Sequence, residues 1–219
     1  MIKIIKLQTV NSTNNFAKNV IAGQAFASSS PENAEYDLPF AIIADEQTEG
    51  RGRYGKSFFS PGSKGVYLSY VCEGKYGLDD LQQLTVVAAA VVHRVLQNYC
   101  NDDLSIKWIN DIYRGERKLA GILTERVDDP AMPGKYTIII GVGVNVIPCE
   151  VPTELESIIG FLYDNAVNDV IDGIATNLVN ALNDTFADGS ADDFPSLIDY
   201  YLSHCYNLPS DFADKLLNE

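Results

Sequence analysis

The sequence predicts an α+β fold in which helices flank a mixed, largely antiparallel β-sheet. Strand-like segments cluster in the first two-thirds of the chain, several follow one another through hairpin-length connections, and the final third has helical periodicity. Short connections favour antiparallel pairing, whereas a doubly wound parallel sheet needs a crossover between successive strands. With 219 residues and 46% hydrophobic composition, the chain is expected to form one domain over 1–219.

The first half of the chain carries short strand-like segments separated by polar or glycine-rich stretches. β-branched and aromatic residues mark the strands. Ser12, Thr13 and Asn14 are favourable helix N-caps and precede a short helical pattern. We therefore expect strands at 2–7, 39–45 and 66–72, a helix at 14–22, and loops at 23–37 and 46–64.

The second half begins with the clearest helical pattern. Apolar residues at spacings of three and four predict a helix that ends near Tyr99 and is capped by Asp79 or Asp80. The following segments predict several strands, a hairpin turn and a mainly helical C-terminal part. We expect strands at 104–108, 112–113, 119–127 and 136–146, a turn at 114–117, and mainly helical structure over 154–219, with helices at 166–186 and 194–206.

Composition excludes several classes of protein. A net charge of −14 argues against a nucleic-acid partner. No apolar stretch reaches the length of a membrane span, and the N-terminus lacks the apolar region of a signal peptide. The four cysteines have no CxxC spacing and the two histidines are too few for a typical zinc site, so we expect buried thiols. We predict a cytoplasmic protein without a membrane partner.

The charge is distributed unevenly along the chain. Residues 51–64 and 107–118 together hold 8 of the 16 basic residues and 2 of the 30 acidic ones. These segments carry +6, so the rest of the chain carries −20. A basic focus on an acidic body suggests a small anionic ligand, although an uneven surface charge without function gives the same pattern.

The first basic segment contains the glycine- and arginine-rich stretch Gly50–Lys56. It fits the dinucleotide motif G-x-G-x-x-G and, with Ser57, the phosphate-loop motif, but both motifs must open a helix. Pro61-Gly62 and the strand pattern that follows exclude a long helix here. The alternatives are a flexible surface loop or a loop whose glycines admit a ligand while its arginines bind carboxylate or phosphate.

The second basic segment surrounds a predicted hairpin. Lys107–Asp111 ends one strand and Arg117–Gly121 begins the return strand, so Asp111 is expected close to Lys118. A carboxylate between lysines can hold Mg²⁺ or orient a lysine, and lysines can neutralise charge on a phosphoryl group. A salt-bridged hairpin without function is the alternative.

Five motifs, taken in order, resemble those of the biotin protein ligase family. They are Ser12–Asn14, Gln47–Arg53, Lys107–Asp111, Lys118–Gly121 and Gly141–Asn145. The resemblance covers about residues 1–147 and implies the class II synthetase-like fold of biotin and lipoate ligases. It also implies a reaction with ATP and Mg²⁺ that gives biotinyl-5′-AMP, followed by transfer of biotin to a lysine of a carboxylase's biotin carboxyl carrier domain.

The resemblance further implies a role for each matching residue. The residues implied to be catalytic are Arg53, Lys118 and Lys107. Those implied to contact biotin are Ser12, Thr13, Asn14, Gln47, Gly50, Arg51, Gly52 and Gly121. Those implied to bind the nucleotide are Arg53, Lys56, Phe58, Asn110, Asp111, Lys118 and Asn145, with Asp111 also a Mg²⁺ ligand.

The chain departs from the family pattern in several places. Ile109 replaces the usual proline and Phe58 a common tryptophan, and both changes are expected to preserve shape. Glu49 places a negative charge in the basic loop and is expected to weaken anion binding. We expect no winged-helix domain, no repressor activity and no small C-terminal β-domain. Family members often pair through sheet edges, which leaves a homodimer open.

Two other functions stay open at this stage. A lipoate or octanoate ligase shares the fold and reaction, but its loop resembles Arg-Arg-x-Gly-Gly-Gly rather than Gly-Arg-Gly-Arg. A non-catalytic biotin- or nucleotide-binding module is less consistent with the presence of both Arg53 and Lys118. We also predict that the Gly50–Lys56 loop is mobile without ligand, because closely spaced cations and glycines favour disorder.

Overall fold

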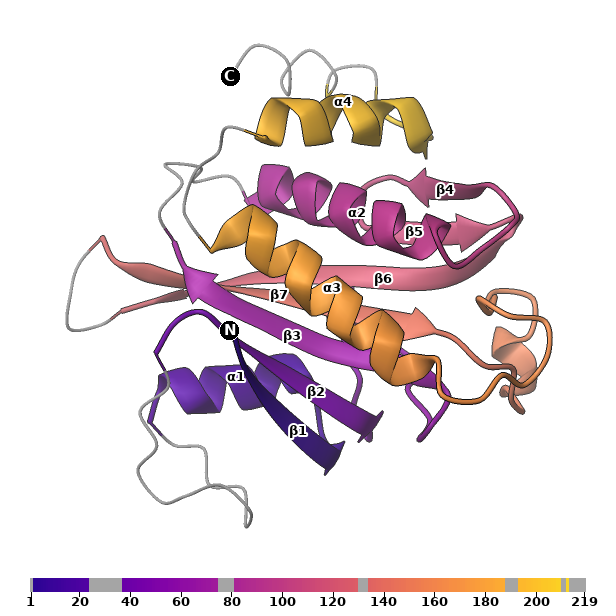
Figure 1. Cartoon of the computed structure of the whole chain (residues 1–219), viewed down its shortest axis with the longest axis horizontal. Helices are drawn as coiled ribbons and strands as arrows, with labels where there is room; N and C mark the ends of the chain where they lie inside the picture. Colours follow the sequence, from indigo (N-terminus) through magenta and orange to yellow (C-terminus); the bar gives the residue numbers. More distant parts are fainter. Residues whose placement is uncertain are drawn as a thin grey trace.

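The computed structural model describes residues 2–23, 37–74, 81–129, 134–187, 193–209 and 212. Within them, eight strands form one sheet. The strands are β1 (Lys3–Val10), β2 (Phe40–Gln47), β3 (Gly65–Glu73), β4 (Leu104–Lys107), β5 (Asp111–Arg114), β6 (Arg117–Asp128), β7 (Tyr136–Asn145) and β8 (Cys205–Tyr206). Their spatial order is β1-β2-β3-β7-β6-β5-β4-β8 (Figure 1).

The strand pairings confirm the expected mixed, largely antiparallel sheet. β1 pairs with β2 in parallel, and β8 pairs with β4 in parallel. The other neighbouring pairs are antiparallel. The hairpins β4–β5, β5–β6 and β6–β7 follow directly along the chain, as their short connections predict.

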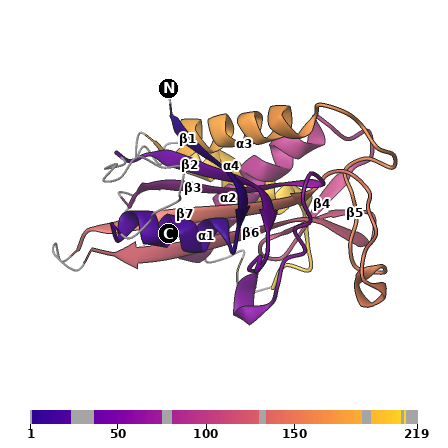
Figure 2. The ribbon, with the colours of Figure 1, turned by 90° about the horizontal axis from the view of Figure 1, so that it is seen from below.

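Helices cover both faces of the sheet. They are α1 (Thr13–Ile21), α2 (Leu81–Gln97), α3 (Ile171–Phe186) and α4 (Phe194–His204). α2, α3 and α4 lie on one face and α1 lies alone on the other (Figure 2). None of these helices combines the length and apolar content needed to cross a bilayer.

Each face has its own hydrophobic core. The larger core packs α2, α3 and α4 on the sheet, and α2 is almost fully buried because its sequence is apolar nearly all round. The smaller core includes Ala17 of α1 against Ile42 of β2 and Val71 of β3. Because α1 covers only part of its face, the remaining sheet surface is left for a cleft.

The final third departs from the sequence prediction in three places. Residues 156–170 contain no α-helix, so the mainly helical prediction for 154–219 is wrong there and the helix expected at 166–186 begins at Ile171. The helix expected at 194–206 ends at His204, because Cys205 and Tyr206 pair with the open edge of β4. In the first stretch, backbone groups of Ile158 and Gly160 bond to Lys118 of β6, and those of Leu162 and Tyr163 bond to the chain at the end of β7.

Other expected elements are present with boundaries shifted by a few residues. Most of the loop expected at 23–37 and both candidate caps, Asp79 and Asp80, fall outside the described residues.

Candidate active site

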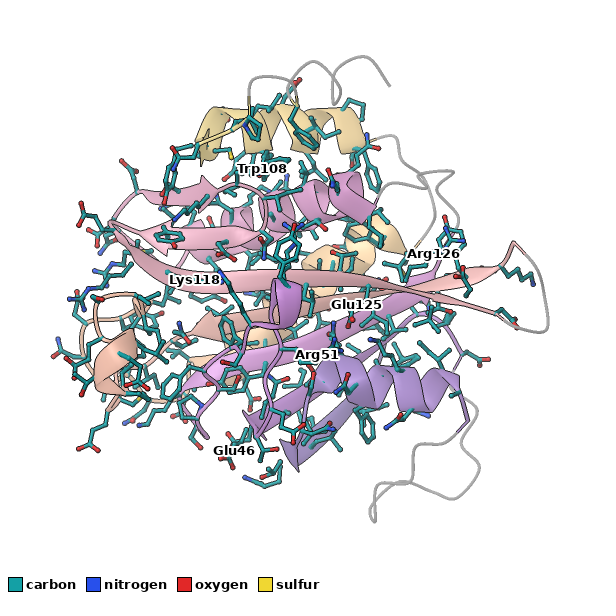
Figure 3. All side chains as sticks on the ribbon, turned by 180° about the vertical axis from the view of Figure 1, so that it is seen from behind. Glu46, Arg51, Trp108, Lys118, Glu125 and Arg126 are labelled. Carbon is teal, nitrogen blue, oxygen red and sulfur yellow. The ribbon has the colours of Figure 1, made fainter. Side chains whose placement is uncertain are left out.

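A cleft of about 1420 Å³ opens on the α1 face of the sheet (Figure 3). Segments far apart in the sequence meet there: the start of α1, the loop after β2, the β4–β5 hairpin, β6 and β7. The cleft is lined by every residue for which the family resemblance implied a role. These are Ser12, Thr13, Asn14, Gln47, Gly50, Arg51, Gly52, Arg53, Lys56, Phe58, Lys107, Asn110, Asp111, Lys118, Gly121 and Asn145.

Glycines keep the floor of the cleft flat. Gly121 of β6 and Gly143 of β7 are paired across the sheet, and the Phe58 ring lies against both. A side chain at Gly143 would collide with that ring, and one at Gly141 would collide with the Asn14 amide. The Gly-x-Gly-x-Asn strand therefore lets the loop and α1 approach the sheet closely.

A chain of hydrogen bonds connects α1 with the loop after β2. The Thr13 backbone N–H and hydroxyl donate to Gln47 Oε1 at 2.9 and 3.2 Å. Gln47 Nε2 donates to Ser60 Oγ at 3.0 Å, and the Ser60 hydroxyl donates to the Phe58 carbonyl at 3.0 Å. Thr13 and Gln47 thus brace the cleft, whereas the Ser12 side chain makes no capping bond to the helix.

The Asn14 side chain makes its hydrogen bonds within the protein. It is buried, its Oδ1 accepts a 2.6 Å hydrogen bond from Ser69, and its Nδ2 donates to the Leu123 carbonyl and to Glu125. An amide nitrogen has two hydrogens, and both are used. Asn14 therefore lines the cleft chiefly as a brace between α1 and the sheet.

The Gly50–Lys56 loop folds back on itself. Phe58 N–H donates to the Gly50 carbonyl at 2.8 Å, and Gly52 N–H donates to the Lys56 carbonyl at 2.7 Å. The tip is a 3-10 turn, Arg53–Gly55, in which Tyr54 has a φ of 56° and is 88% exposed. The next regular element is a strand, which confirms that neither nucleotide-binding helix motif applies.

The two arginines of this loop point in different directions. Arg51 donates to Asn15 at 2.8 Å and lies 3.4 Å from Glu125, so its side chain points toward α1 and β6 (Figure 3). Arg53 lies over the Tyr54 ring and its guanidinium is 3.5 Å from Asn110 Oδ1. Lys56 is exposed at the rim.

The hairpin side of the cleft is fixed by the sheet. Lys118 Nζ lies 2.7 Å from Asp111 Oδ1, as the hairpin predicted. The Lys118 backbone N–H donates to the Ile158 carbonyl at 2.7 Å, and its carbonyl accepts from Gly160 N–H at 2.8 Å. Asn145 Nδ2 also points to this carbonyl, at 3.4 Å. Lys118 is therefore held at both its backbone and its ammonium.

Lys107 and Asn110 have other partners on the hairpin. Lys107 Nζ lies 3.5 Å from the Tyr113 hydroxyl and 5.1 Å from that ring, and Tyr113 raises the pKa of Lys107. Asn110 Nδ2 donates to the Ile122 carbonyl at 2.9 Å, which ties the hairpin to β6. Lys107 thus flanks Asp111 without an ion pair to it among the described contacts.

Asp111 is the one protein ligand predicted for Mg²⁺ in this cleft. The described residues contain no group of three or more His, Cys, Asp or Glu side chains arranged to hold a metal ion. Asp111 offers one carboxylate, and Lys118 already contacts one of its oxygens. Mg²⁺ is commonly held by one or two carboxylates together with substrate phosphates, so the site fits an ion that arrives with a nucleotide.

Sequence reasoning missed one wall of the cleft and the buried Ser60. Leu155, Ile158 and Ile159 line the cleft as an apolar wall, and Ile158 is 47% exposed. The available signal was the apolar character of these three residues, which the helical prediction for this part of the chain did not connect with the cleft. An apolar wall near the cationic side chains of the cleft suits a ligand with both a flat ring and an anionic group.

Comparisons with known proteins agree with this geometry. A model of the biotin/lipoate A/B protein ligase family matches residues 9–145. The chain is 28% identical over 179 residues to the bifunctional ligase/repressor BirA of Bacillus subtilis (strain 168), covering 81% of this chain and 55% of that protein. It is 34% identical over 107 residues to the biotin–[acetyl-CoA-carboxylase] ligase of Paracoccus denitrificans, covering 48% of this chain and 43% of that protein.

Among solved structures, a similar one is the biotin protein ligase from Aquifex aeolicus in complex with biotin and ATP. It matches with a TM-score of 0.64 and 26% identity over 90% of this chain and 76% of that chain. The chain spans about half the length of the two curated relatives above.

Proposed function

This chain belongs to the biotin/lipoate A/B protein ligase family, and we propose that it is a biotin protein ligase. The observation that carries the proposal is the convergence of all sixteen role-bearing residues on one cleft, with Lys118 on the wall formed by β6 and Arg53 on the wall formed by the loop after β2. A cleft with cations on two sides can hold two anions, a carboxylate and a phosphate, against their mutual repulsion.

In the first proposed step, an oxygen of the biotin carboxylate attacks the α-phosphorus of ATP. The bond from that phosphorus to the bridging oxygen breaks, and pyrophosphate leaves with the bond electrons. Lys118 and Arg53 neutralise the carboxylate and the α-phosphate, and Lys56 and Lys107 meet the remaining phosphate charge. Alignment and charge neutralisation supply most of the catalysis, so no covalent nucleophile of the protein is required.

In the second step, the neutral ε-amine of a carrier lysine attacks the acyl carbon of biotinyl-5′-AMP. The bond from that carbon to the phosphate oxygen breaks, AMP leaves, and the amine proton passes to solvent. We propose that the acceptor is the biotin carboxyl carrier domain of a carboxylase in the cytoplasm. Mg²⁺ is proposed to enter with ATP, with Asp111 as its one protein ligand.

Binding roles follow the two halves of the cleft. We assign the biotin ring to the side formed by Ser12, Thr13, Gln47 and the backbone of Gly50–Gly52. The nucleotide is assigned to the side formed by Phe58, Asn110, Asp111, Asn145 and the apolar wall. Gly121 is assigned to the biotin side, where a side chain would crowd the Lys118 ammonium and the Phe58 ring.

The identity of the acid that the chain activates distinguishes a biotin ligase from a lipoate or octanoate ligase. ATP–pyrophosphate exchange should be measured with biotin, lipoate or octanoate as the added acid. We expect exchange with biotin only. Exchange with lipoate or octanoate alone would assign the chain to the lipoate branch, and no exchange with any acid would indicate a non-catalytic binding module.

A further inference from the structure

Glu125 occupies an unusual place for a carboxylate. It lies on β6, on the face that carries the cleft and α1, two residues beyond Leu123 of the cleft floor. Its side chain is only 18% exposed. A carboxylate this buried is costly unless other groups compensate its charge.

Three side chains from two separate segments compensate it. Lys18 Nζ lies 2.7 Å from Glu125 Oε1, and Asn14 Nδ2 donates to Oε2 at 2.9 Å, both from α1. Arg51 of the loop lies 3.4 Å from Oε1 (Figure 3). One carboxylate therefore connects the sheet, the first turns of α1 and the base of the Gly50–Lys56 loop.

The charges make this connection specific. Lys18 and Arg51 are both cations and approach the same oxygen, so without the carboxylate they would repel each other. Burial alone would raise the pKa of Glu125, but hydrogen bonds from Lys18 and Asn14 and the positive charges of Lys18 and Arg51 lower it. The pKa of Glu125 therefore lies below its ordinary value, which favours the anionic form that these ion pairs need.

We propose that Glu125 is a positioning residue for the biotin side of the cleft. It acts through Arg51, which it holds toward α1 so that the backbone of Gly50–Gly52 faces the cleft. This inference rests on the proposed function, because biotin is the ligand whose binding the loop would set. The residue itself does not line the cleft, so it acts indirectly.

The first test is Glu125→Gln, which keeps the size of the side chain and removes its charge. We expect the KM for biotin in ATP–pyrophosphate exchange to rise about tenfold, equivalent to about 1.4 kcal/mol. The KM for ATP should change less than twofold, because the nucleotide side has no contact with Glu125. A loss of stability alone would not separate the two KM values in this way.

Asp128→Asn is the matched control. Asp128 is on the same strand and also pairs with an arginine, Arg126, at 2.7 Å, but neither residue lines the cleft. We expect this variant to leave both KM values unchanged. An equal rise in the biotin KM in both variants would overturn the specific role of Glu125.

Arg51→Gln removes the same ion pair from the loop side, without a change inside the sheet. It should reproduce the rise in biotin KM. The biotin KM of the double variant with Glu125→Gln should be no higher than that of Arg51→Gln alone, because the proposed effect of Glu125 on biotin passes through the ion pair that Arg51→Gln already breaks. Additive effects would show that Glu125 does not act through Arg51, and would overturn the proposal. If Glu125→Gln does not fold, Arg51→Gln alone still decides whether this ion pair sets the biotin KM.

Hydrogen exchange without ligand keeps this test separate from the proposed function. Residues 50–56 should exchange faster in Glu125→Gln and Arg51→Gln than in the wild-type chain, and Asp128→Asn should match the wild type. Unchanged exchange in both loop variants would overturn the positioning role. If both variants exchange faster but the wild-type chain has no biotin-dependent activity, only the proposed ligase function is contradicted.

Discussion

The two cationic walls of the cleft are built differently. Lys118 stands in regular sheet, its backbone is bonded on both sides, and its ammonium lies 2.7 Å from Asp111. Arg53 stands in a 3-10 turn beside the exposed Tyr54, and its closest polar contacts are 3.1 Å to the Tyr54 hydroxyl and 3.5 Å to Asn110. The Lys118 ammonium is therefore positioned by the fold, whereas the Arg53 guanidinium lies where a ligand can move it.

This difference separates two contributions to catalysis. A charge that the sheet fixes stabilises the transition state without reorganisation when the reaction occurs. A charge on an exposed turn must be ordered by the ligand, which costs conformational entropy and couples its effect to binding. Substitutions on the hairpin should therefore act on the chemical step, and those on the loop should also act on binding.

Removal of the fixed charge should give the largest effect. We expect Lys118→Ala to slow biotin-dependent ATP–pyrophosphate exchange about 10²- to 10³-fold, the range found when a preorganised electrostatic contact is removed. The circular dichroism spectrum should stay unchanged. Lys6→Ala, which changes an exposed lysine paired with Asp172 outside the cleft, is the control and should retain full activity. Near-normal exchange in Lys118→Ala would remove this lysine from the proposed role.

Removal of the loop charge should give a smaller and more distributed effect. Arg53→Ala should lower kcat/KM about 10- to 100-fold, or about 1.4 to 2.7 kcal/mol, with changes in both kcat and the KM for biotin. Arg53→Lys should recover only part of the loss, because a lysine lacks the two-pronged donor geometry. A change in kcat alone would contradict the idea that ligand binding places this charge.

Helix α4 contacts the β4–β5 turn from the face of the sheet opposite the cleft. The buried Tyr201 hydroxyl donates to the Ile109 carbonyl at 3.2 Å, in the segment that leads to Asn110. Tyr201→Phe should leave that carbonyl unpaired, which costs about 1–3 kcal/mol of unfolding free energy, and should slow exchange several-fold. Thermal denaturation and exchange assays measure the two effects.

Tyr200→Phe is the matched control, because the Tyr200 hydroxyl bonds to His93 away from the cleft. It should lose stability while exchange stays within about twofold of the wild type, since that bond does not touch the hairpin. Equal loss of activity in both variants would mean that the hairpin depends on general stability and not on the Ile109 contact.

The smallest effect concerns loop order. The base of the Gly50–Lys56 loop is held by backbone bonds, including the one from Gly52 N–H to the Lys56 carbonyl, so we confine the predicted mobility to the tip, Arg53–Gly55. Limited trypsin digestion should cleave after Arg53 or Lys56, and saturating biotin should slow this cleavage. Cleavage at the same rate with and without biotin would contradict ligand-dependent ordering of this wall.

Local patterns predicted most of the fold, whereas the ordered motifs of the family resemblance named the residues that line the cleft. Alternating β-branched segments with short turns predicted the antiparallel hairpins, and the hairpin turn at 114–117 correctly placed Lys118 beside Asp111. These features depend on neighbours within a few residues along the chain, which a sequence displays directly.

Long-range partners could not be predicted in the same way. Asn14 donates a hydrogen bond to Glu125, which is 111 residues away in the sequence. The Ser12–Asn14 motif alone therefore does not show that the Asn14 amide is occupied by bonds within the protein. Cys205 and Tyr206 leave their predicted helix because the edge of β4 offers backbone partners. Residues 158–163 are likewise not helical, because their backbone groups bond to Lys118 of β6 and to the chain at the end of β7.

The most direct test of the two-wall account is a crystal structure of the chain with a stable biotinyl-5′-AMP analogue. We predict that Lys118 keeps its position, while Arg53 leaves Asn110 and the Tyr54 hydroxyl and comes within about 2.7–3.1 Å of the acyl-phosphate oxygens. A complex in which Arg53 keeps those two contacts, or in which Lys118 lies away from the phosphate, would contradict the account.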